Sequence, residues 1–138
     1  MNTVVVLANG CFDLLHFGHL LHLKAAKRMG DVLVVSVTRD DCVNKGPGRP
    51  VFNQDQRKEL VGSIAYVDRT IIVGSSIEAL RRIRPTIFVK GADYAGKIRD
   101  EDAAYCAKHG IKIAFTNEQQ YSSTQLLRHY EPGSYKNV

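Results

Sequence analysis

The stretch NGCFDLLHFGH (residues 9–19) follows the apolar run TVVVLA (3–8) and precedes the amphipathic run HLLHLKAAKRMG (19–30). The apolar run is typical of a strand buried on both faces, and the amphipathic run has helical spacing and ends at Gly30. Residues 9–19 are therefore predicted to form a strand-to-helix loop. Its two histidines, His16 and His19, are three positions apart, which places both side chains on one face.

The rest of the chain repeats the order of strand and then helix. Apolar strands are predicted over 31–38, 69–74, 86–91 and 111–116, and helices over 53–67, 76–84, 99–110 and 122–130, with Asn53 and Ser76 as caps. Buried strands that alternate with helices indicate a parallel sheet covered on both faces. The expected fold class is α/β, a single Rossmann-like, doubly wound domain with a mostly parallel five-stranded sheet. Residues 1–130 would form this domain and 131–138 a flexible C-terminal tail.

Composition limits the classes of function. The chain has 138 residues and a net charge of +5, but its basic residues are scattered and form no basic arm, so a nucleic-acid partner is not expected. An anionic small-molecule substrate explains the excess of basic residues equally well. No apolar run approaches a membrane span or resembles a secretory signal. The three cysteines lack CxxC spacing, which favours free thiols and a cytoplasmic location.

The histidine loop is the strongest candidate for a functional site, because ligands of doubly wound sheets bind at the carboxyl ends of the strands. A helix N-terminus presents free N–H groups that favour an anion. Two imidazole donors beside those amides suit a polyphosphate whose charge rises in a transition state. The alternative is structural, with His16 as a helix cap and His19 as a hydrogen-bonded core histidine.

Two other kinds of site fit the loop less well. A zinc site lacks a third ligand, because Cys11 is expected on the turn and His22 on the helix side, facing away from the loop. A dinucleotide-binding loop needs G-x-G-x-x-G after the first strand. The chain has only Gly46 and Gly48 in that spacing, and these follow the second strand.

The motifs together resemble a known family. GCFDLLHFGH is similar to the H-x-G-H signature of the nucleotidyltransferase superfamily, in its cytidylyltransferase-like branch. It is followed in order by KGPGRPVFNQDQR, YVDRTIIV, RPTIFVKGADY and YSSTQLL. These segments resemble heptose-phosphate adenylyltransferases and, less closely, glycerol-3-phosphate cytidylyltransferase. The resemblance covers nearly the whole chain.

The resemblance implies roles for the matching positions. His16, His19 and Lys45 would be catalytic, with the histidines contacting the nucleotide phosphates and stabilising the transition state at the α-phosphorus. The nucleotide-binding residues would come from the first loop, the KGADY segment and the start of the last helix: Asn9, Gly10, Cys11, Phe12, Gly18, Lys90, Gly91, Asp93, Ser122, Ser123 and Thr124. The hydroxyls of the last three could instead cap that helix. The substrate-binding residues would be Asp13, Asp40, Arg49 and Arg57. Asp13 is expected mainly to brace the loop, and a surface salt bridge is the alternative for Arg57.

The implied reaction is transfer of a nucleotidyl group from a nucleoside triphosphate, with Mg²⁺ as cofactor, to a small phosphorylated acceptor. ATP and a sugar phosphate such as heptose 1-phosphate are preferred. CTP with a polyol phosphate or a small phosphonate remains open. A homodimer is expected by resemblance. Two other classes of function were considered. The intact histidine pair disfavours a nucleotide-binding module without catalysis, and the missing glycine fingerprint disfavours a nicotinamide-dependent oxidoreductase.

Overall fold

The computed structural model describes residues 2–117. In chain order the strands and helices alternate: β1 Val5–Gly10, α1 Phe17–Lys27, β2 Val32–Thr38, α2 Gln54–Gly62, β3 Arg69–Val73, α3 Ser76–Ile83, β4 Ile87–Gly91, α4 Asp100–His109 and β5 Lys112–Thr116, with short 3₁₀ turns at Asp40–Cys42 and Ala92–Tyr94. The expected order of strands and helices is confirmed over these residues. The helix expected over 122–130 and the tail 131–138 lie outside them.

The five strands form one parallel sheet in the order β3-β2-β1-β4-β5. Val5 of β1 pairs with Val32 of β2, and Val6 of β1 pairs with Ile87 of β4. The chain therefore builds outward from β1 to β3 and then crosses to the other side of β1. This reversal makes a crevice between the carboxyl ends of β1 and β4, the usual ligand position in such sheets.

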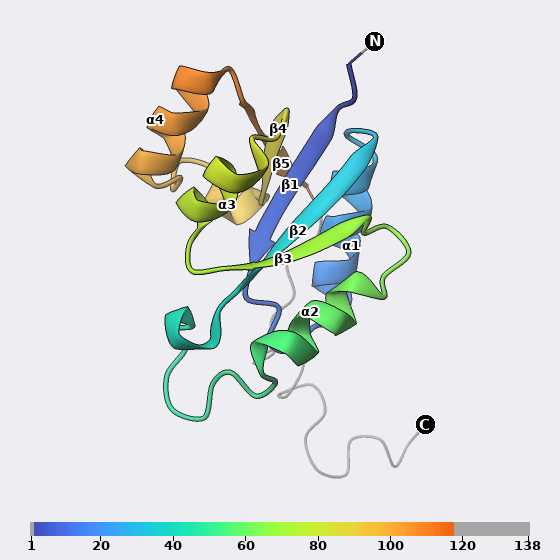
Figure 1. Cartoon of the computed structure of the whole chain (residues 1–138), viewed down its shortest axis with the longest axis vertical. Coiled ribbons are helices and arrows are strands. Elements are labelled where there is room, and N and C mark those ends of the chain that lie inside the picture. Colours follow the sequence, from blue (N-terminus) through green and yellow to red (C-terminus); the bar gives the residue numbers. More distant parts are fainter. Residues whose placement is uncertain (1, 118–138) are drawn as a thin grey trace.

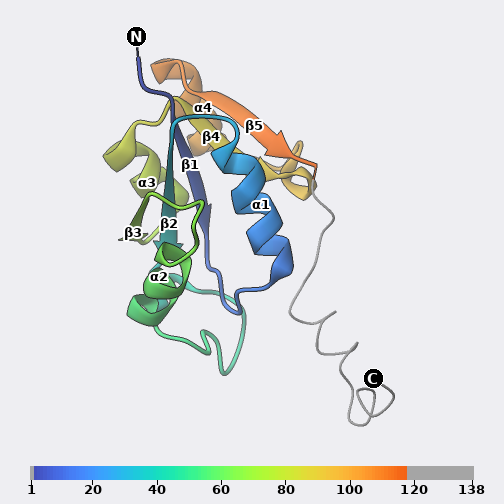
Figure 2. The same ribbon diagram turned by 90° about the vertical axis from the view of Figure 1, so that its right-hand side faces the viewer.

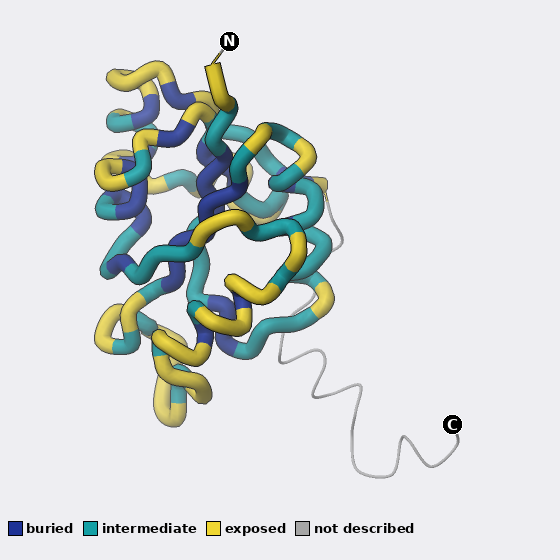
Figure 3. The backbone as a smooth tube through the Cα atoms, turned by 45° about the vertical axis from the view of Figure 1, so that its right-hand side comes forward, coloured by how far each residue is buried: buried dark blue, intermediate teal, exposed yellow. Residues whose placement is uncertain are grey.

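Helices cover both faces of the sheet, with α1 and α2 on one side and α3 and α4 on the other (Figures 1 and 2). Alternate residues of each central strand supply the two cores. Val6 and Ala8 pack with Leu23 of α1, while Leu7 packs with Leu80 of α3. The middle residues of the central strands β1 and β2 are buried, whereas most of the loop after β2 is exposed (Figure 3). No helix within residues 2–117 is long and apolar enough to cross a membrane.

Local sequence sets the helix boundaries. Asn53 caps α2 as expected, in a reciprocal pair of hydrogen bonds with Gln56. Gly110 ends α4 at φ 66°, in the left-handed region that glycine adopts without steric cost. The expectation for α3 was wrong by one residue, because Ser75 is the cap and its side chain accepts from the Glu78 amide. Helix α2 ends at Gly62 rather than at residue 67.

Candidate functional site

The loop between β1 and α1 is held in a tight turn. Phe12 adopts φ 55°, a left-handed conformation that costs a non-glycine residue about 1–2 kcal/mol. Its buried ring lies over Gly10, where an added Cβ would come within 2.9 Å of a ring carbon. The same ring meets His19 edge-on, with 5.2 Å between ring centroids. Glycine at position 10 therefore lets Phe12 support the imidazole of His19.

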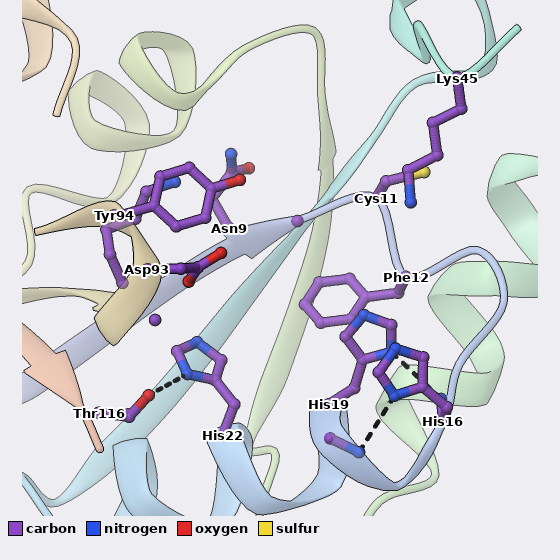
Figure 4. Close-up of a pocket in the computed structure, with 14 residues that line it drawn as sticks. Asn9, Cys11, Phe12, His16, His19, His22, Lys45, Asp93, Tyr94 and Thr116 are labelled. Carbon is purple, nitrogen blue, oxygen red and sulfur yellow. Dashed lines mark hydrogen bonds between the residues drawn. The ribbon is translucent and has the colours of Figure 1, made fainter. Parts of the chain in front are cut away.

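His16 is the N-cap of α1, so the helix begins two residues earlier than the sequence pattern indicated. The Gly18 amide donates to His16 Nδ1 at 3.1 Å, and the His16 amide donates to His19 Nδ1 at 3.1 Å. The two rings stack with 3.9 Å between their centroids (Figure 4). The predicted shared face is confirmed. The structural alternative for His16 is also found, since it is both a cap and part of the pocket wall.

These caps determine the protonation of the pair. A ring nitrogen that accepts from a backbone amide carries no proton, so the proton of each neutral imidazole is on Nε2. Burial lowers the pKa of His19 to about 3, with repulsion from His16, Lys45 and His22 adding to the effect. Burial and then Lys45 also lower the pKa of His16. At neutral pH both residues are therefore neutral Nε2–H donors.

A pocket of about 270 Å³ opens beside these donors, at the crevice between β1 and β4. Eleven of its lining residues match expected catalytic or nucleotide-binding positions: Asn9, Gly10, Cys11, Phe12, His16, Gly18, His19, Lys45, Lys90, Gly91 and Asp93. They come from the ends of β1 and β4, the loop after β1, the start of α1, the loop after β2 and the turn after β4. The structure thus brings together residues that are up to 84 positions apart in sequence (9 to 93). Ser122, Ser123 and Thr124 lie outside the described residues.

Three further residues line the same pocket: His22, Tyr94 and Thr116. The expectation that His22 faces away from the loop is wrong, because its Nδ1 lies 2.9 Å from Thr116 Oγ1 on the pocket wall (Figure 4). Burial and the nearby Lys90 ammonium lower the pKa of His22, against an opposing effect of Asp93. The spacing of 16, 19 and 22 was the signal that could have placed it, since each step of three stays near one helix face.

Lys45 and Arg49 lie in the long loop after β2, and both contact Asp13. The Lys45 ammonium donates to the Asp13 carbonyl at 3.3 Å, and Arg49 Nε donates to the Asp13 carboxylate at 2.8 Å. The amides of Val51 and Phe52 donate to the same fully buried carboxylate. Burial raises the pKa of Asp13, but these hydrogen bonds outweigh it and the net pKa is lowered. Asp13 therefore braces the loop that carries Lys45.

Arg57 is fully buried and links the loop after β1 to the loop after β2. Its guanidinium donates to the carbonyls of Cys11, Thr38 and Phe52 at 2.7–2.9 Å, and to Asp40 at 2.6 Å. It is therefore not the surface salt bridge considered as the alternative. None of the four expected substrate-binding residues (Asp13, Asp40, Arg49 and Arg57) lines the pocket. Direct contact between them and an acceptor stays a prediction.

The described pocket fits Mg²⁺ only if waters or a bound phosphate supply most of the ligands of the ion. Within residues 2–117, no three His, Cys, Asp or Glu side chains are grouped as metal ligands. Mg²⁺ usually keeps several waters and binds through substrate phosphates and one or two carboxylates. Asp93 is the carboxylate among the lining residues of the described pocket, so it is the protein ligand available there.

Comparison with known proteins agrees with this geometry. Residues 7–129 match the family model described as cytidylyltransferase-like. The chain belongs to the cytidylyltransferase-like family. It is 42% identical over 97 residues to the bifunctional protein HldE of Campylobacter fetus, covering 67% of this chain and 21% of that protein. HldE of Helicobacter pylori is 36% identical over 127 residues, which cover 89% of this chain and 27% of that protein.

The chain thus spans about a quarter of the length of these curated relatives. Among solved structures, this cytidylyltransferase-like domain resembles the lipopolysaccharide core biosynthesis protein of Thermoplasma volcanium, with a TM-score of 0.73 and 31% identity over 86% of this chain and all of that chain. Pantoate-beta-alanine ligase of Francisella tularensis has a TM-score of 0.62 at 18% identity, covering 88% of this chain and 61% of that one, and shares the fold alone.

Proposed function

We propose that this domain transfers a nucleotidyl group from a nucleoside triphosphate to the phosphate of a small acceptor. The observation that carries the proposal is the stacked His16–His19 pair, whose backbone hydrogen bonds leave two Nε2–H donors at the N-terminus of α1. Lys45 lines the same pocket and adds a cation. This combination suits a triphosphate, and membership of the cytidylyltransferase-like family supports it.

The reaction needs no strong base. An acceptor phosphate oxygen is already anionic, so it attacks the α-phosphorus directly and in line. The bond from the α-phosphorus to its bridging oxygen breaks, and the electron pair leaves with pyrophosphate. Catalysis then rests on positioning and on stabilising the charge of the transferring phosphoryl group. When bound, Mg²⁺ neutralises charge on the departing pyrophosphate.

The described contacts support a role for three side chains in these steps. His16 and His19 donate to oxygens of the α-phosphate as negative charge develops there. Their stacking and capping bonds fix both rings before substrate arrives, so little reorganisation is needed in the transition state. Lys45 can exchange its bond to the Asp13 carbonyl for one to a phosphate. Asp13 and Arg49 keep its loop over the pocket.

ATP and a sugar phosphate, heptose 1-phosphate in particular, are the preferred substrate pair in this proposal. The preference rests on the K-G-x-x-R-P and K-G-x-D-Y segments, and the HldE relatives are compatible with it. In NEQQYSST (117–124), Asn117 stands where glycerol-3-phosphate cytidylyltransferases carry arginine, which disfavours direct transfer of their cytidine selectivity. CTP with a polyol phosphate is the second substrate pair to be tested.

The test is pyrophosphate release with Mg²⁺ and either ATP or CTP, in the presence of heptose 1-phosphate or glycerol 3-phosphate. Release with ATP and heptose 1-phosphate is expected. Release only with CTP and glycerol 3-phosphate would instead select the alternative pair. Nucleotide binding without pyrophosphate release from any pair would indicate a binding module and refute the proposal.

Substitution of the histidines tests the site itself. His16→Ala and His19→Ala are each expected to lower kcat by about 10²–10³-fold, as loss of one oxyanion donor does. His109→Ala, at the end of α4, is a matched control that should retain the wild-type rate. Near-normal turnover in either His16→Ala or His19→Ala would contradict the assignment.

A further inference from the structure

Asp102 is a buried carboxylate that the site described above does not use. It lies in the first turn of α4 with 2% of its surface exposed. Its Oδ2 accepts a 2.6 Å hydrogen bond from Ser76 Oγ of α3, whereas its Oδ1 has no hydrogen-bond partner among residues 2–117. A buried carboxylate with an unpaired oxygen is costly unless a positive charge nearby offsets it. The bond to Ser76 therefore accounts for only half of this carboxylate.

Lys90, at the end of β4, is the cation that this carboxylate can stabilise. Lys90 lines the nucleotide pocket and, together with Ser76, an adjoining cavity of about 310 Å³, so its ammonium lies on the same side of the sheet as the partner of Asp102. Lys90 is partly buried, and no ion pair within residues 2–117 includes either Lys90 or Asp102. The ammonium lies 4.4 Å from the centroid of the Tyr94 ring, which brings it no anionic partner.

The charges around Lys90 differ in how strongly solvent screens them. Burial lowers the pKa of Lys90, and the Asp102 carboxylate is the largest effect that opposes this; Arg99 lowers the pKa further and Asp93 raises it. Because Asp93 is exposed and Asp102 is not, solvent weakens the effect of Asp93 far more. The other titratable groups around the ammonium are His22 of α1, Tyr94 in the turn after β4 and Lys97 before α4. Asp102 is therefore the buried anion of this group.

We propose that Asp102 is a positioning residue of the reaction, whose carboxylate keeps the Lys90 ammonium charged at the wall of the nucleotide pocket. The inference rests on the proposed function and deepens it, because it names the group that keeps a substrate-binding cation available. Ser76 holds the carboxylate from α3, and Oδ1 stays free to face a positive charge. A charged Lys90 makes charge-assisted hydrogen bonds to substrate phosphates and offsets their negative charge, whereas a neutral amine lacks that charge.

A purely structural role for Asp102 would be to tie α3 to α4 through its bond to Ser76. Both roles predict that a change at Asp102 costs stability, but only the proposed role predicts a change in the titration of Lys90. Two variants separate the roles. Ser76→Ala removes the hydrogen bond and keeps the charge, whereas Asp102→Asn removes the charge and can still accept from Ser76.

The experiment is a pH titration of the full chain with isotope-labelled lysine, followed by NMR at the Lys90 side chain and assigned with Lys90→Arg. Asp102→Asn is expected to lower the titration midpoint of Lys90 by about one pH unit, since a nearby opposite charge typically shifts a pKa by that much or more. Ser76→Ala should leave the midpoint close to that of wild type. Asp100→Asn, which removes an exposed carboxylate from the same turn of α4, is the matched control.

Equal Lys90 midpoints in wild type and Asp102→Asn would overturn the proposal. So would a fall in the midpoint that Asp100→Asn reproduces in full, because the buried position of Asp102 would then be irrelevant. Asn has nearly the shape of Asp, so the variant should fold. Asp102→Ser removes the same charge and provides the same comparison if Asp102→Asn does not fold.

Pyrophosphate release as a function of pH extends the test to the reaction. The alkaline loss of kcat/KM should begin about one pH unit lower in Asp102→Asn than in wild type. In a Lys90→Arg background the two profiles should coincide, because a guanidinium stays charged throughout this range. Transfer with identical profiles in wild type and Asp102→Asn refutes only the role of Asp102. A lowered Lys90 midpoint without transfer by wild type refutes the proposed function and leaves the charge coupling in place.

Discussion

Replacing His19 by glutamine is expected to reduce the loss of stability on acidification. Glutamine at this third helical position can still accept from the His16 amide, because Ser/Thr-x-x-Gln capping boxes use the same reciprocal bond. It cannot titrate. The variant therefore removes one proton-binding group from α1 while it preserves the cap, and any change in pH dependence reports on that group.

The sign and size of the effect follow from the pKa of His19. In the folded chain it is about 3, against an ordinary value of 6.5, so the unfolded chain binds the proton first as pH falls. The stabilisation is complete above pH 6.5 and is lost progressively towards pH 3. At pH 5 the solution is about 1.5 pH units below the pKa of His19 in the unfolded chain, whereas His19 in the folded chain is still neutral. At 1.36 kcal/mol per unit, this lowers the free energy of unfolding by about 2 kcal/mol.

The measurement is urea unfolding of wild type and His19→Gln at pH 8 and pH 5, with coincident fluorescence and circular dichroism transitions as the two-state check. His16 and His22 titrate in both proteins, so their contributions largely cancel in the comparison. Wild type should lose about 2 kcal/mol more than the variant. Losses that agree within about 0.5 kcal/mol would refute the view that His19 is held neutral by burial.

Three other substitutions test the surroundings of the pocket. Lys45→Ala should lower kcat by at least about tenfold with little loss of stability, because its exposed side chain supplies charge rather than packing; unchanged pyrophosphate release would contradict its role. Arg57→Met should lower the free energy of unfolding by about 3 kcal/mol or more, because the substitution leaves three buried carbonyls without donors. Urea titration at pH 7.5 measures this loss of stability. His22→Phe should raise the nucleotide KM by about fivefold with a smaller change in kcat, because the variant loses one polar contact and the bond to Thr116; an equal KM would show that His22 does not contact the nucleotide.

Much of the fold could be predicted because its information is local. Buried strands appear as apolar runs, and Asn53 and Gly110 mark helix ends through bonds and conformations within a few residues. The helical pattern placed the start of α1 at residue 19 instead of 17, because histidine is not among the usual capping residues and a cap at His16 was considered only as an alternative. The cap of α3 was misplaced because Ser75 and Ser76 are adjacent and equally suitable by type.

The candidate site could be predicted in part. H-x-G-H identified His16 and His19, and the segments around Lys45 and Lys90 followed from the family pattern. His22 was missed although its spacing from His16 and His19 was a local signal, and its contact with Thr116, 94 residues away, could not be predicted from the sequence. Asp13 was expected mainly to brace the loop, and its contacts confirm this. The partners of Arg57 could not be predicted, because they come from several loops that only the folded chain brings together.

The sequence by itself determined the alternation of strands and helices and the parallel sheet, and it predicted an anion site in the first loop, because each depends on short-range spacing. Only the tertiary structure decided that β1 lies between β2 and β4, so that the carboxyl ends of β1 and β4 enclose one pocket. It also decided that both histidines are neutral donors, because burial and a reciprocal cap are properties of the assembled site.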